Sequence, residues 1–296
     1  MNNSILRTPL IPYRTEVPIQ NGKIFLKPEN LQPFGSYKIR GVKSAIEHTP
    51  IAVLRQGISA ASAGNMAQPV AYWAQKNSLR CQIFVPDSAP QIKKDAIVKL
   101  KAQLIELPFA QVWDLIKNPP QNHEGLFIHP VFTKGLLEGY GAIADELIFD
   151  LATLNAVIIP FGVGGLTLGI ARRMKKINPR VLIYACEPET AAPLKASLKL
   201  GSAKHVQRIA SFVDAIGTPE VLPEVFDEVK NLIEDSLVVT LDEVRAAMID
   251  LAHTHKLICE GAAAASLAAA IQLNKENPSL KIACVLTGGN TSEFRL

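Results

Sequence analysis

The 296-residue chain contains only four cysteines, and their spacing does not suit a metal site. No two of them form a CxxC pair or another ligand spacing. Each lies in or beside an apolar segment, which favours reduced cysteines in the core of a cytosolic protein. The four are Cys81, Cys186, Cys259 and Cys284. We therefore expect neither a disulfide framework nor a cysteine-bound metal ion.

The chain also has no long hydrophobic run and no strong charge imbalance. No segment reaches the ~18–20 apolar residues that a membrane span needs, and residues 1–4 begin no apolar signal core. The net charge is only +4, and the lysines and arginines are mixed with acidic residues. We expect a soluble, cytoplasmic protein that binds neither membrane nor nucleic acid.

Two nucleotide-binding motifs are missing as well, GxGxxG and GxxxxGK[ST], which argues against NAD and ATP. The chain does contain a different glycine-rich stretch, residues 160–166, between a predicted strand and a predicted helix. Glycines let the backbone turn tightly and direct several N–H groups at one anion, and the helix start adds its positive end. This stretch predicts a phosphate site.

Short apolar segments alternate with helical patterns along most of the chain. Strands are predicted at residues 81–85, 156–160, 181–185 and 281–286. Apolar strands of this kind, separated by helices, indicate parallel sheets buried on both faces. We see no internal repeat or low-complexity linker, and the alanine-rich run at 262–270 predicts a close-packed helix. In such α/β folds, ligands bind beyond the carboxyl ends of the strands.

Lys38 lies at one such strand-to-helix junction. A strand at residues 22–27 is followed by a Pro-Phe-Gly turn, and apolar residues then recur at helical spacing from Ile39. Ser36 is a plausible N-cap, which places Lys38 in the first helical turn. A partly desolvated lysine near a positive helix end is easily held neutral, so Lys38 is a candidate Schiff-base lysine. Taken alone, such a lysine is more often a solvated surface charge.

Four stretches together carry a family resemblance. They are Gly35-Ser36-Tyr37-Lys38-Ile39-Arg40-Gly41, Ser62-Ala63-Gly64-Asn65-Met66-Ala67-Gln68, Gly162-Val163-Gly164-Gly165-Leu166 and Thr287-Gly288-Gly289-Asn290. In this order they resemble pyridoxal-phosphate enzymes of the tryptophan-synthase-like group, fold type II. Within it, the chain looks most like the threonine/serine dehydratase and serine racemase family. The resemblance runs from about residue 8 to the end of the chain.

This resemblance implies two open α/β domains with mainly parallel, twisted sheets flanked by helices. The smaller domain, residues 53–133, would bind substrate and be inserted into the larger. Residues 1–52 and 134–296 would form the larger, cofactor-binding domain, with pyridoxal 5'-phosphate in the cleft between the two. Family members also suggest a homodimer. Because Leu296 closely follows the last predicted strand, we expect no appended regulatory domain.

The resemblance also implies roles for individual residues. Lys38 would bind the cofactor covalently, Asn65 its 3'-oxygen and Thr287 its pyridine nitrogen. A neutral hydroxyl at Thr287 leaves that nitrogen largely unprotonated, which favours prompt β-elimination. The expected cofactor-binding residues are Lys38, Tyr37, Asn65, Gly162, Val163, Gly164, Gly165, Leu166 and Thr287. The expected substrate-carboxylate residues are Ser62, Ala63, Gly64, Asn65 and Met66, at a helix start.

Several positions depart from the family pattern. Met66 stands where histidine is common, Pro69 where glycine is common, and Val163 interrupts a glycine run. A backbone donor at Val163 survives this change if its φ is not positive. Ala63 occupies the position of the serine that serves as an acid in serine racemases. A methyl group cannot carry a proton, so racemisation by that route is disfavoured.

The predicted function is therefore elimination and deamination of L-threonine or L-serine to a 2-oxo acid and ammonia, with Lys38 taking the α-proton. One alternative is a related lyase for 3-hydroxyaspartate or 3-phenylserine, for which Met66 and Tyr140 would matter. Serine racemase is another alternative. A third is an inactive binding protein with the same fold, against which intact Lys38, Asn65 and Thr287 argue. The O-acetylserine sulfhydrylase pattern fits less well.

Other chemistry-bearing residues suggest no separate site. His253 and His255 are two apart on a predicted helix and point in different directions, so a metal pair is not expected. Residues 208–214 lack the acidic arrangement with which many family members bind a divalent ion, so we predict no such ion. His129 is expected to be structural. Glu187 and Glu260 are either near the cofactor or ordinary helix-start carboxylates.

Overall fold

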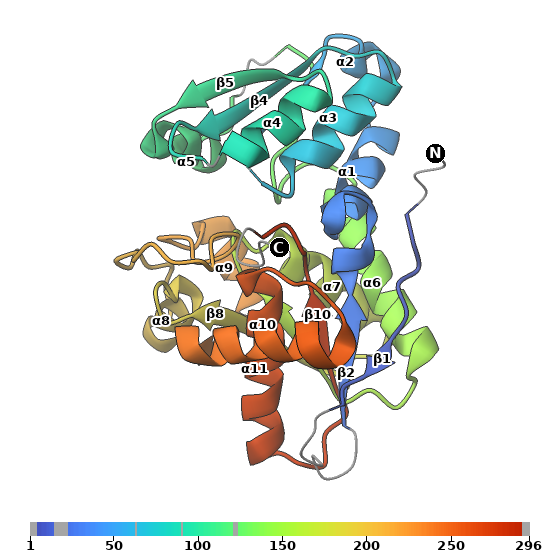
Figure 1. Cartoon of the computed structure of the whole chain (residues 1–296), viewed down its shortest axis with the longest axis vertical. Coiled ribbons are helices and arrows are strands. Elements are labelled where there is room, and N and C mark those ends of the chain that lie inside the picture. The colour runs from blue at the N-terminus through green and yellow to red at the C-terminus, as the bar shows by residue number, and fades with distance from the viewer. Residues whose placement is uncertain (1–4, 15–22, 63, 90, 121–123, 292–296) are drawn as a thin grey trace. The chain divides into compact units, whose positions relative to one another are not determined.

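A computed structural model describes residues 5–14, 23–62, 64–89, 91–120 and 124–291 of the chain. The chain forms two compact units: Met1–Tyr37 with Gly141–Leu296, here called the larger unit, and Lys38–Tyr140, the smaller unit. Each unit is a mainly parallel sheet flanked by helices (Figure 1). The predicted α/β fold class, with one unit inserted in the other, is confirmed.

The smaller unit has a four-stranded sheet in the order β5-β4-β3-β6, and all its pairs are parallel. Its strands are β3 (Ile58–Ala61), β4 (Cys81–Pro86), β5 (Gln103–Leu107) and β6 (Leu126–Phe127). Its helices are α1 (Lys38–Glu47), α2 (Ile51–Leu54), α3 (Ala67–Lys76), α4 (Gln91–Lys99) and α5 (Phe109–Lys117). The chain first moves outward from β3 to β5 and then returns to β6. Because parallel crossovers are right-handed, α3 and α4 cover one face and α5 the other.

The larger unit has a six-stranded sheet in the order β1-β2-β10-β7-β8-β9, parallel except for β1. Its strands are β1 (Ile11–Pro12), β2 (Ile24–Pro28), β7 (Ala156–Pro160), β8 (Leu182–Pro188), β9 (Asp235–Val239) and β10 (Ile282–Leu286). Its α-helices are α7 (Gly165–Ile177), α8 (Pro193–Leu200), α9 (Pro223–Val229), α10 (Leu241–His255) and α11 (Gly261–Glu276). Helix α6 (Leu136–Asp150) begins in the smaller unit and continues in the larger. Short 3-10 turns, η1 (Glu29–Leu31) and η2 (Pro33–Gly35), follow β2.

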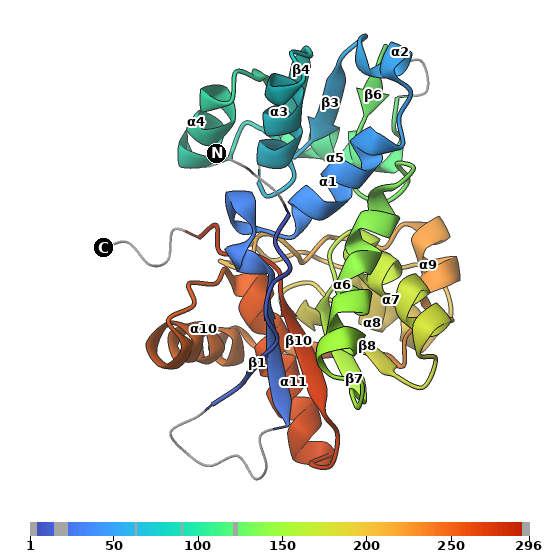
Figure 2. The same ribbon diagram turned by 90° about the vertical axis from the view of Figure 1, so that its right-hand side faces the viewer.

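The alanine-rich helix α11 lies against the centre of the larger sheet. Figure 1 shows α10 and α11 in front of the strands and α7 behind them, and Figure 2 shows the same layers turned by 90°. Every residue from Ala262 to Ala270 is buried. Small side chains let this helix approach β7 and β10 closely, as predicted for the run.

One buried ion pair in the larger unit was not foreseen from the sequence. Lys27 of β2 has no exposed surface, and its Nζ lies 2.6 Å from a carboxylate oxygen of Glu146 on α6. The same amine donates to the Thr8 carbonyl at 2.6 Å. An unpaired buried charge would lower the stability of the fold. The ion pair with Glu146 and the hydrogen bond to the Thr8 carbonyl together allow a lysine inside the sheet.

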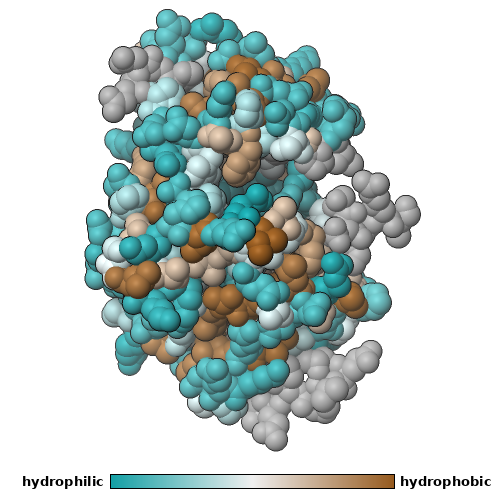
Figure 3. All heavy atoms as spheres, turned by 90° about the vertical axis from the view of Figure 1, so that its left-hand side faces the viewer, coloured by the Kyte–Doolittle hydropathy of each residue, from teal (hydrophilic) through white to brown (hydrophobic). Residues whose placement is uncertain are grey.

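All four cysteines are buried and free, as predicted. Within the described part of the chain, no helix is both long and apolar enough to cross a membrane. On the face in Figure 3, hydrophilic residues predominate and the apolar patches are small and scattered.

Candidate functional site

Lys38 is the first residue of α1, directly after a segment that pairs with the end of β10. The Tyr37 N–H donates to the Thr287 carbonyl at 3.2 Å, and Ser36 forms an antiparallel bridge with Gly288. The Gly289 N–H then donates to the Gly35 carbonyl at 2.9 Å. This short ladder fixes the backbone that leads into the helix, so the start of α1 is set by pairing over long sequence distance. The Lys38 side chain itself is half-buried.

The prediction of Ser36 as the helix N-cap is wrong. Ser36 is extended, with φ −162° and ψ 158°, and α1 begins two residues later. Its buried Oγ makes no hydrogen bond to any described residue. The bridge to Gly288 holds Ser36 in a strand-like conformation, and this long-range pairing overrides the local capping preference.

Thr287 directly follows β10, and its buried hydroxyl has no hydrogen-bond partner among the described residues. The residue is 4% exposed, and its Oγ1 makes no hydrogen bond within the described residues. A buried hydroxyl normally finds a partner, because leaving it unsatisfied costs about 1–3 kcal/mol. The neighbouring Tyr37 is buried too. Burial, reinforced by the Glu260 carboxylate, raises the pKa of Tyr37, so its phenol stays protonated at neutral pH.

The glycine-rich loop joins β7 to α7. Gly164 is the N-cap of α7 with φ +99°, and a Cβ there would lie 2.5 Å from Cγ1 of Val225. Val163 is not among the residues with positive φ, so the condition set for its backbone donor is met. The N–H groups of residues 162–167 donate no hydrogen bond to another described residue. A run of unpaired N–H groups at a helix start is suited to a phosphate.

The loop and Thr287 lie at the same edge of the larger sheet. Strands β7 and β10 are parallel neighbours, with Cys284 opposite Ile158. Their carboxyl ends, Pro160 and Leu286, therefore lie side by side. Thr287 follows Leu286 directly, and residues 162–166 begin two residues after Pro160. Parallel sheets bind their ligands at this edge. The donor set, together with the unpartnered Thr287 hydroxyl, fits a phosphorylated ring with an accepting nitrogen.

The predicted carboxylate loop lies in the smaller unit, between β3 and α3. The Ser62 Oγ accepts from the Gly64 N–H at 3.2 Å, and the Ala67 N–H donates to the Gly64 carbonyl at 3.1 Å. Met66 is 4% exposed and directly precedes α3. Asn65 lies beside it in the same turn, whereas Ala63 falls outside the described residues.

Pro69 fits its helix without loss. It is the third residue of α3, where an N–H would have no partner within the helix. The departure from glycine at this position therefore costs no helical hydrogen bond.

The structure thus groups the predicted site residues by unit. The smaller unit contains Lys38 and the loop residues Ser62, Gly64, Asn65 and Met66. The larger unit contains Tyr37, residues 162–166 and Thr287.

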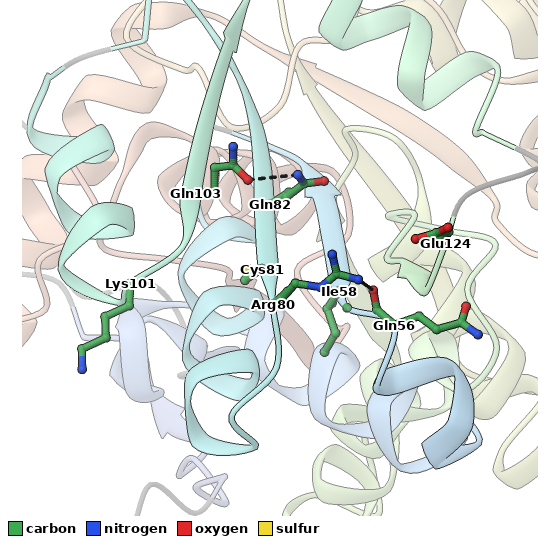
Figure 4. A pocket seen from close by; sticks show the side chains of 9 residues that line it. Gln56, Ile58, Arg80, Cys81, Gln82, Lys101, Gln103 and Glu124 are labelled. Carbon is green, nitrogen blue, oxygen red and sulfur yellow. Dashed lines mark hydrogen bonds between the residues drawn. The ribbon is translucent and has the colours of Figure 1, made fainter.

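A pocket of about 570 Å³ in the smaller unit contains none of these residues. It opens at the amino ends of the strands, where Gly57, Arg80 and Lys101 precede β3, β4 and β5. Figure 4 shows the hydrogen bond between neighbouring strands in which Gln82 Nε2 on β4 donates to Gln103 Oε1 on β5, at 3.0 Å. Because parallel sheets bind ligands at the opposite edge, we do not assign the activity to this pocket.

His129 and His255 have structural partners. His129 is buried, with Nε2 2.8 Å from the Ile116 carbonyl, and its Nδ1 accepts from the Val131 N–H at 3.1 Å. Since Nδ1 accepts, Nε2 carries the proton and donates. His255 contacts the backbone of Arg14 and stacks on Tyr13. No group of three or more metal-ligating side chains comes together in the described ranges.

Glu187 is a helix-start carboxylate near the end of β8. Its oxygens accept from the Leu194 and Lys195 N–H groups, both at 2.8 Å, and from the Ser236 hydroxyl at 2.6 Å. These donors stabilise the ionised form, but burial outweighs them and raises the pKa of Glu187 from 4.5 to about 7. The Glu187 carboxylate thus stabilises the start of α8, and we assign it no role in binding a ligand.

This raised pKa predicts a pH-dependent stability. Between pH 4.5 and about 7, the carboxyl is ionised in the unfolded chain and protonated in the folded one. Unfolding then releases a proton, so the free energy of unfolding falls as pH rises through this window, by up to about 3 kcal/mol. Glu187→Gln lacks this contribution. Urea unfolding of the wild-type protein and of Glu187→Gln across this window should give plots of unfolding free energy against pH that diverge. Parallel plots would contradict the raised pKa of Glu187.

Comparison with known proteins places the chain in a family. Residues 1–288 match the model of the family described as "Pyridoxal-phosphate dependent enzyme". L-threonine ammonia-lyase of Thermotoga maritima is 32% identical over 293 residues, which cover 98% of this chain and 73% of that protein.

Two solved structures are similar over nearly the whole chain. The processed form of threonine deaminase isoform 2 from Solanum lycopersicum has a TM-score of 0.86 at 27% identity, covering 98% of this chain and 86% of that one. Serine racemase from Dictyostelium discoideum has a TM-score of 0.84 at 29% identity, covering 97% and 94%. The predictions of a lyase-type enzyme and of pyridoxal phosphate as its cofactor are confirmed. The chain belongs to the family of pyridoxal-phosphate-dependent enzymes.

Proposed function

We propose that this enzyme is an ammonia-lyase that converts L-threonine, and L-serine as a second substrate, to a 2-oxo acid and ammonia. The observation that carries the proposal is the buried hydroxyl of Thr287 at the carboxyl end of β10, which has no hydrogen-bond partner in the part of the chain that the structure describes. A neutral hydroxyl there suits elimination rather than reactions that need a protonated ring nitrogen. The similarity to threonine ammonia-lyase along 98% of the chain supports the same reaction.

Each group of residues has a distinct task in this proposal. Lys38 holds the cofactor through its amine and, when released, takes the α-proton of the substrate. The N–H groups of residues 162–166 bind the cofactor phosphate, and Thr287 binds the ring nitrogen. When bound, pyridoxal phosphate supplies the electron sink that makes the α-proton removable. Tyr37 stays neutral and adds no charge near that ring.

The loop after β3 binds the substrate. Its backbone N–H groups and the Ser62 hydroxyl offer the carboxylate a helix-start anion site. Asn65 contacts the cofactor 3'-oxygen, and buried Met66 shapes the apolar part of the pocket. We further propose that the larger unit binds mainly the cofactor and the smaller unit mainly the substrate, in a cytoplasmic homodimer.

Thr287→Val separates a functional hydroxyl from a structural one. Because Thr287 Oγ1 makes no hydrogen bond to a described residue, its loss should change the free energy of unfolding of the cofactor-free protein by less than about 1 kcal/mol. Ammonia release should fall by about 10- to 100-fold, since the ring nitrogen loses its partner. Urea unfolding and an ammonia assay measure the two effects.

Ser266→Ala is the matched control for Thr287→Val. Its buried Oγ lies within hydrogen-bond distance of the carbonyl oxygens of Ala263 and Val285, at 2.7 and 3.0 Å, and can donate to either. Its removal should destabilise the protein by about 1–3 kcal/mol. Equal destabilisation by the two variants would mean that the Thr287 hydroxyl is structural.

The proposal itself is tested with a substrate panel. The purified enzyme, loaded with pyridoxal phosphate, is given L-threonine, L-serine, 3-hydroxyaspartate or 3-phenylserine, and ammonia and 2-oxo acid are measured. Product from L-threonine supports the proposal. Product only from 3-hydroxyaspartate or 3-phenylserine would replace it with the related lyase, and no product from any would favour an inactive binding protein.

Serine racemisation is a second candidate, because one of the similar solved structures is a serine racemase. Chiral analysis of L-serine after incubation distinguishes it from elimination. We expect no D-serine, because Ala63 offers no proton. D-serine formed faster than ammonia would establish the racemase instead.

A further inference from the structure

Tyr140 lies over the face of α1 that carries Lys38. The Lys38 Nζ is 5.9 Å from the centre of the Tyr140 ring. Gly41, three residues further along α1 and hence on the same face, is packed directly against this ring. A Cβ on Gly41 would lie 2.4 Å from Cε1 and 2.9 Å from the hydroxyl oxygen of Tyr140. The phenol therefore lies along this face, and only glycine at position 41 leaves room for it.

The start of α6 that carries Tyr140 is held equally closely. A Cβ on Gly139 would lie 2.4 Å from the Arg40 carbonyl oxygen and 2.8 Å from the Gly41 Cα. Glycines on both helices thus allow the two backbones to approach. Tyr140 has no exposed surface, so its ring cannot turn away from Lys38 without repacking.

Other charged groups of the smaller unit also lie on α1 and on the helices packed against it. On α1, Lys43 pairs with Glu47 at 2.6 Å, and Arg40 is buried. On α3, which packs against α1, the Lys76 Nζ lies 4.6 Å from the centre of the Trp73 ring. On α6, Glu138 is exposed.

We propose that Tyr140 is a positioning residue for Lys38, whose ring face stabilises the protonated amine and holds it in place. The inference rests on the proposed role of Lys38 as the base. When the substrate Cα–H bond breaks, the proton goes to the Lys38 amine and the electron pair stays with the substrate and cofactor. The new ammonium then lies over the ring, and the attraction between a cation and an aromatic face lowers the free energy of this state.

The test reads the charge of Lys38 without turnover. Cofactor-free full-length protein is mixed with pyridoxal phosphate across a pH series, and covalent capture is trapped with borohydride. Only the neutral amine reacts, so the midpoint of the pH profile reports how strongly the ammonium is stabilised. Tyr140→Phe, which keeps the ring, should retain the midpoint. Tyr140→Leu should lower it by about 0.5–1 pH unit and slow ammonia release by about 3- to 30-fold.

Pentafluorophenylalanine at position 140 keeps the proposal testable if Tyr140→Leu fails to fold. It retains the ring shape but removes the negative ring face, so it should lower the midpoint relative to Tyr140→Phe. Tyr72→Phe and pentafluorophenylalanine at position 72 are matched controls. The centre of the Tyr72 ring lies 6.0 Å from the Nζ of a different lysine, Lys76. Both should leave the midpoint unchanged.

Two outcomes would overturn the inference. The first is the same capture midpoint for phenylalanine and for pentafluorophenylalanine at position 140. The second is a shift of the midpoint in Tyr140→Phe as large as the shift in Tyr140→Leu. If instead the midpoints shift as expected but no amino acid of the panel gives ammonia, the proposed function fails and the role of Tyr140 stands.

Discussion

Lys38→Ala is expected to lower ammonia release from L-threonine by at least about 1,000-fold, the largest effect of any single substitution considered for this enzyme. The variant loses both the amine that binds the cofactor and the base that takes the α-proton. The fold should be little affected, since Lys38 is a half-buried first residue of α1 and alanine favours helices. Ammonia assays and circular dichroism of both proteins check the two halves of this expectation.

Lys43→Ala is the matched control on the same helix. Its amine pairs with Glu47 four residues on, and such a pair contributes about 0.3–0.5 kcal/mol. It should therefore keep almost full activity. Substantial activity in Lys38→Ala would show that another residue carries the chemistry, whereas an equal loss in both variants would point to the helix rather than to one amine.

Gly164→Ala is expected to weaken cofactor binding by about 10- to 100-fold and to destabilise the protein by about 2–4 kcal/mol. The residue has φ +99°, where a side chain is strained, and its Cβ would lie 2.5 Å from Cγ1 of Val225. Val225 is fully buried and cannot move aside freely. The loop must therefore shift, and its N–H groups would turn away from the phosphate that we propose they bind. Titration with pyridoxal phosphate and urea unfolding measure both effects.

Gly201→Ala distinguishes the effect of backbone strain at a positive φ from the effect of a steric clash with the new Cβ. Gly201 also has a positive φ, +74°, but a Cβ at this position would meet nothing within 4 Å. It is the C-cap of α8 and is not part of the glycine-rich loop. This variant should lose only about 1–2 kcal/mol of stability and no cofactor affinity. If Gly164→Ala behaves like Gly201→Ala, the loop does not hold the phosphate.

Local signals in the sequence were sufficient for the sheet architecture and for the order of the motifs. Buried strands such as residues 156–160 are short apolar runs, and the glycines after them mark the turn into α7. The alanine-rich run at 262–270 likewise indicated its own close packing. These features depend on neighbours along the chain, so periodicity and turn chemistry reveal them.

Features that depend on distant pairing could not be read in this way. Ser36 carries a helix-capping side chain, yet pairing with Gly288 keeps it extended. Lys27 reads as a strand-edge surface residue until Glu146 is placed beside it. The approach of Tyr140 to Lys38 depends on glycines at positions 41 and 139, whose purpose is visible only once the two helices cross. Residue type alone does not encode such contacts.

The measurement that tests the account most directly is to locate the lysine that carries the cofactor. The enzyme loaded with pyridoxal phosphate is reduced with borohydride, digested, and its peptides are analysed by mass spectrometry. We predict a phosphopyridoxyl group on Lys38. Attachment to a different lysine, or to none, would contradict the assignment on which the proposed mechanism depends.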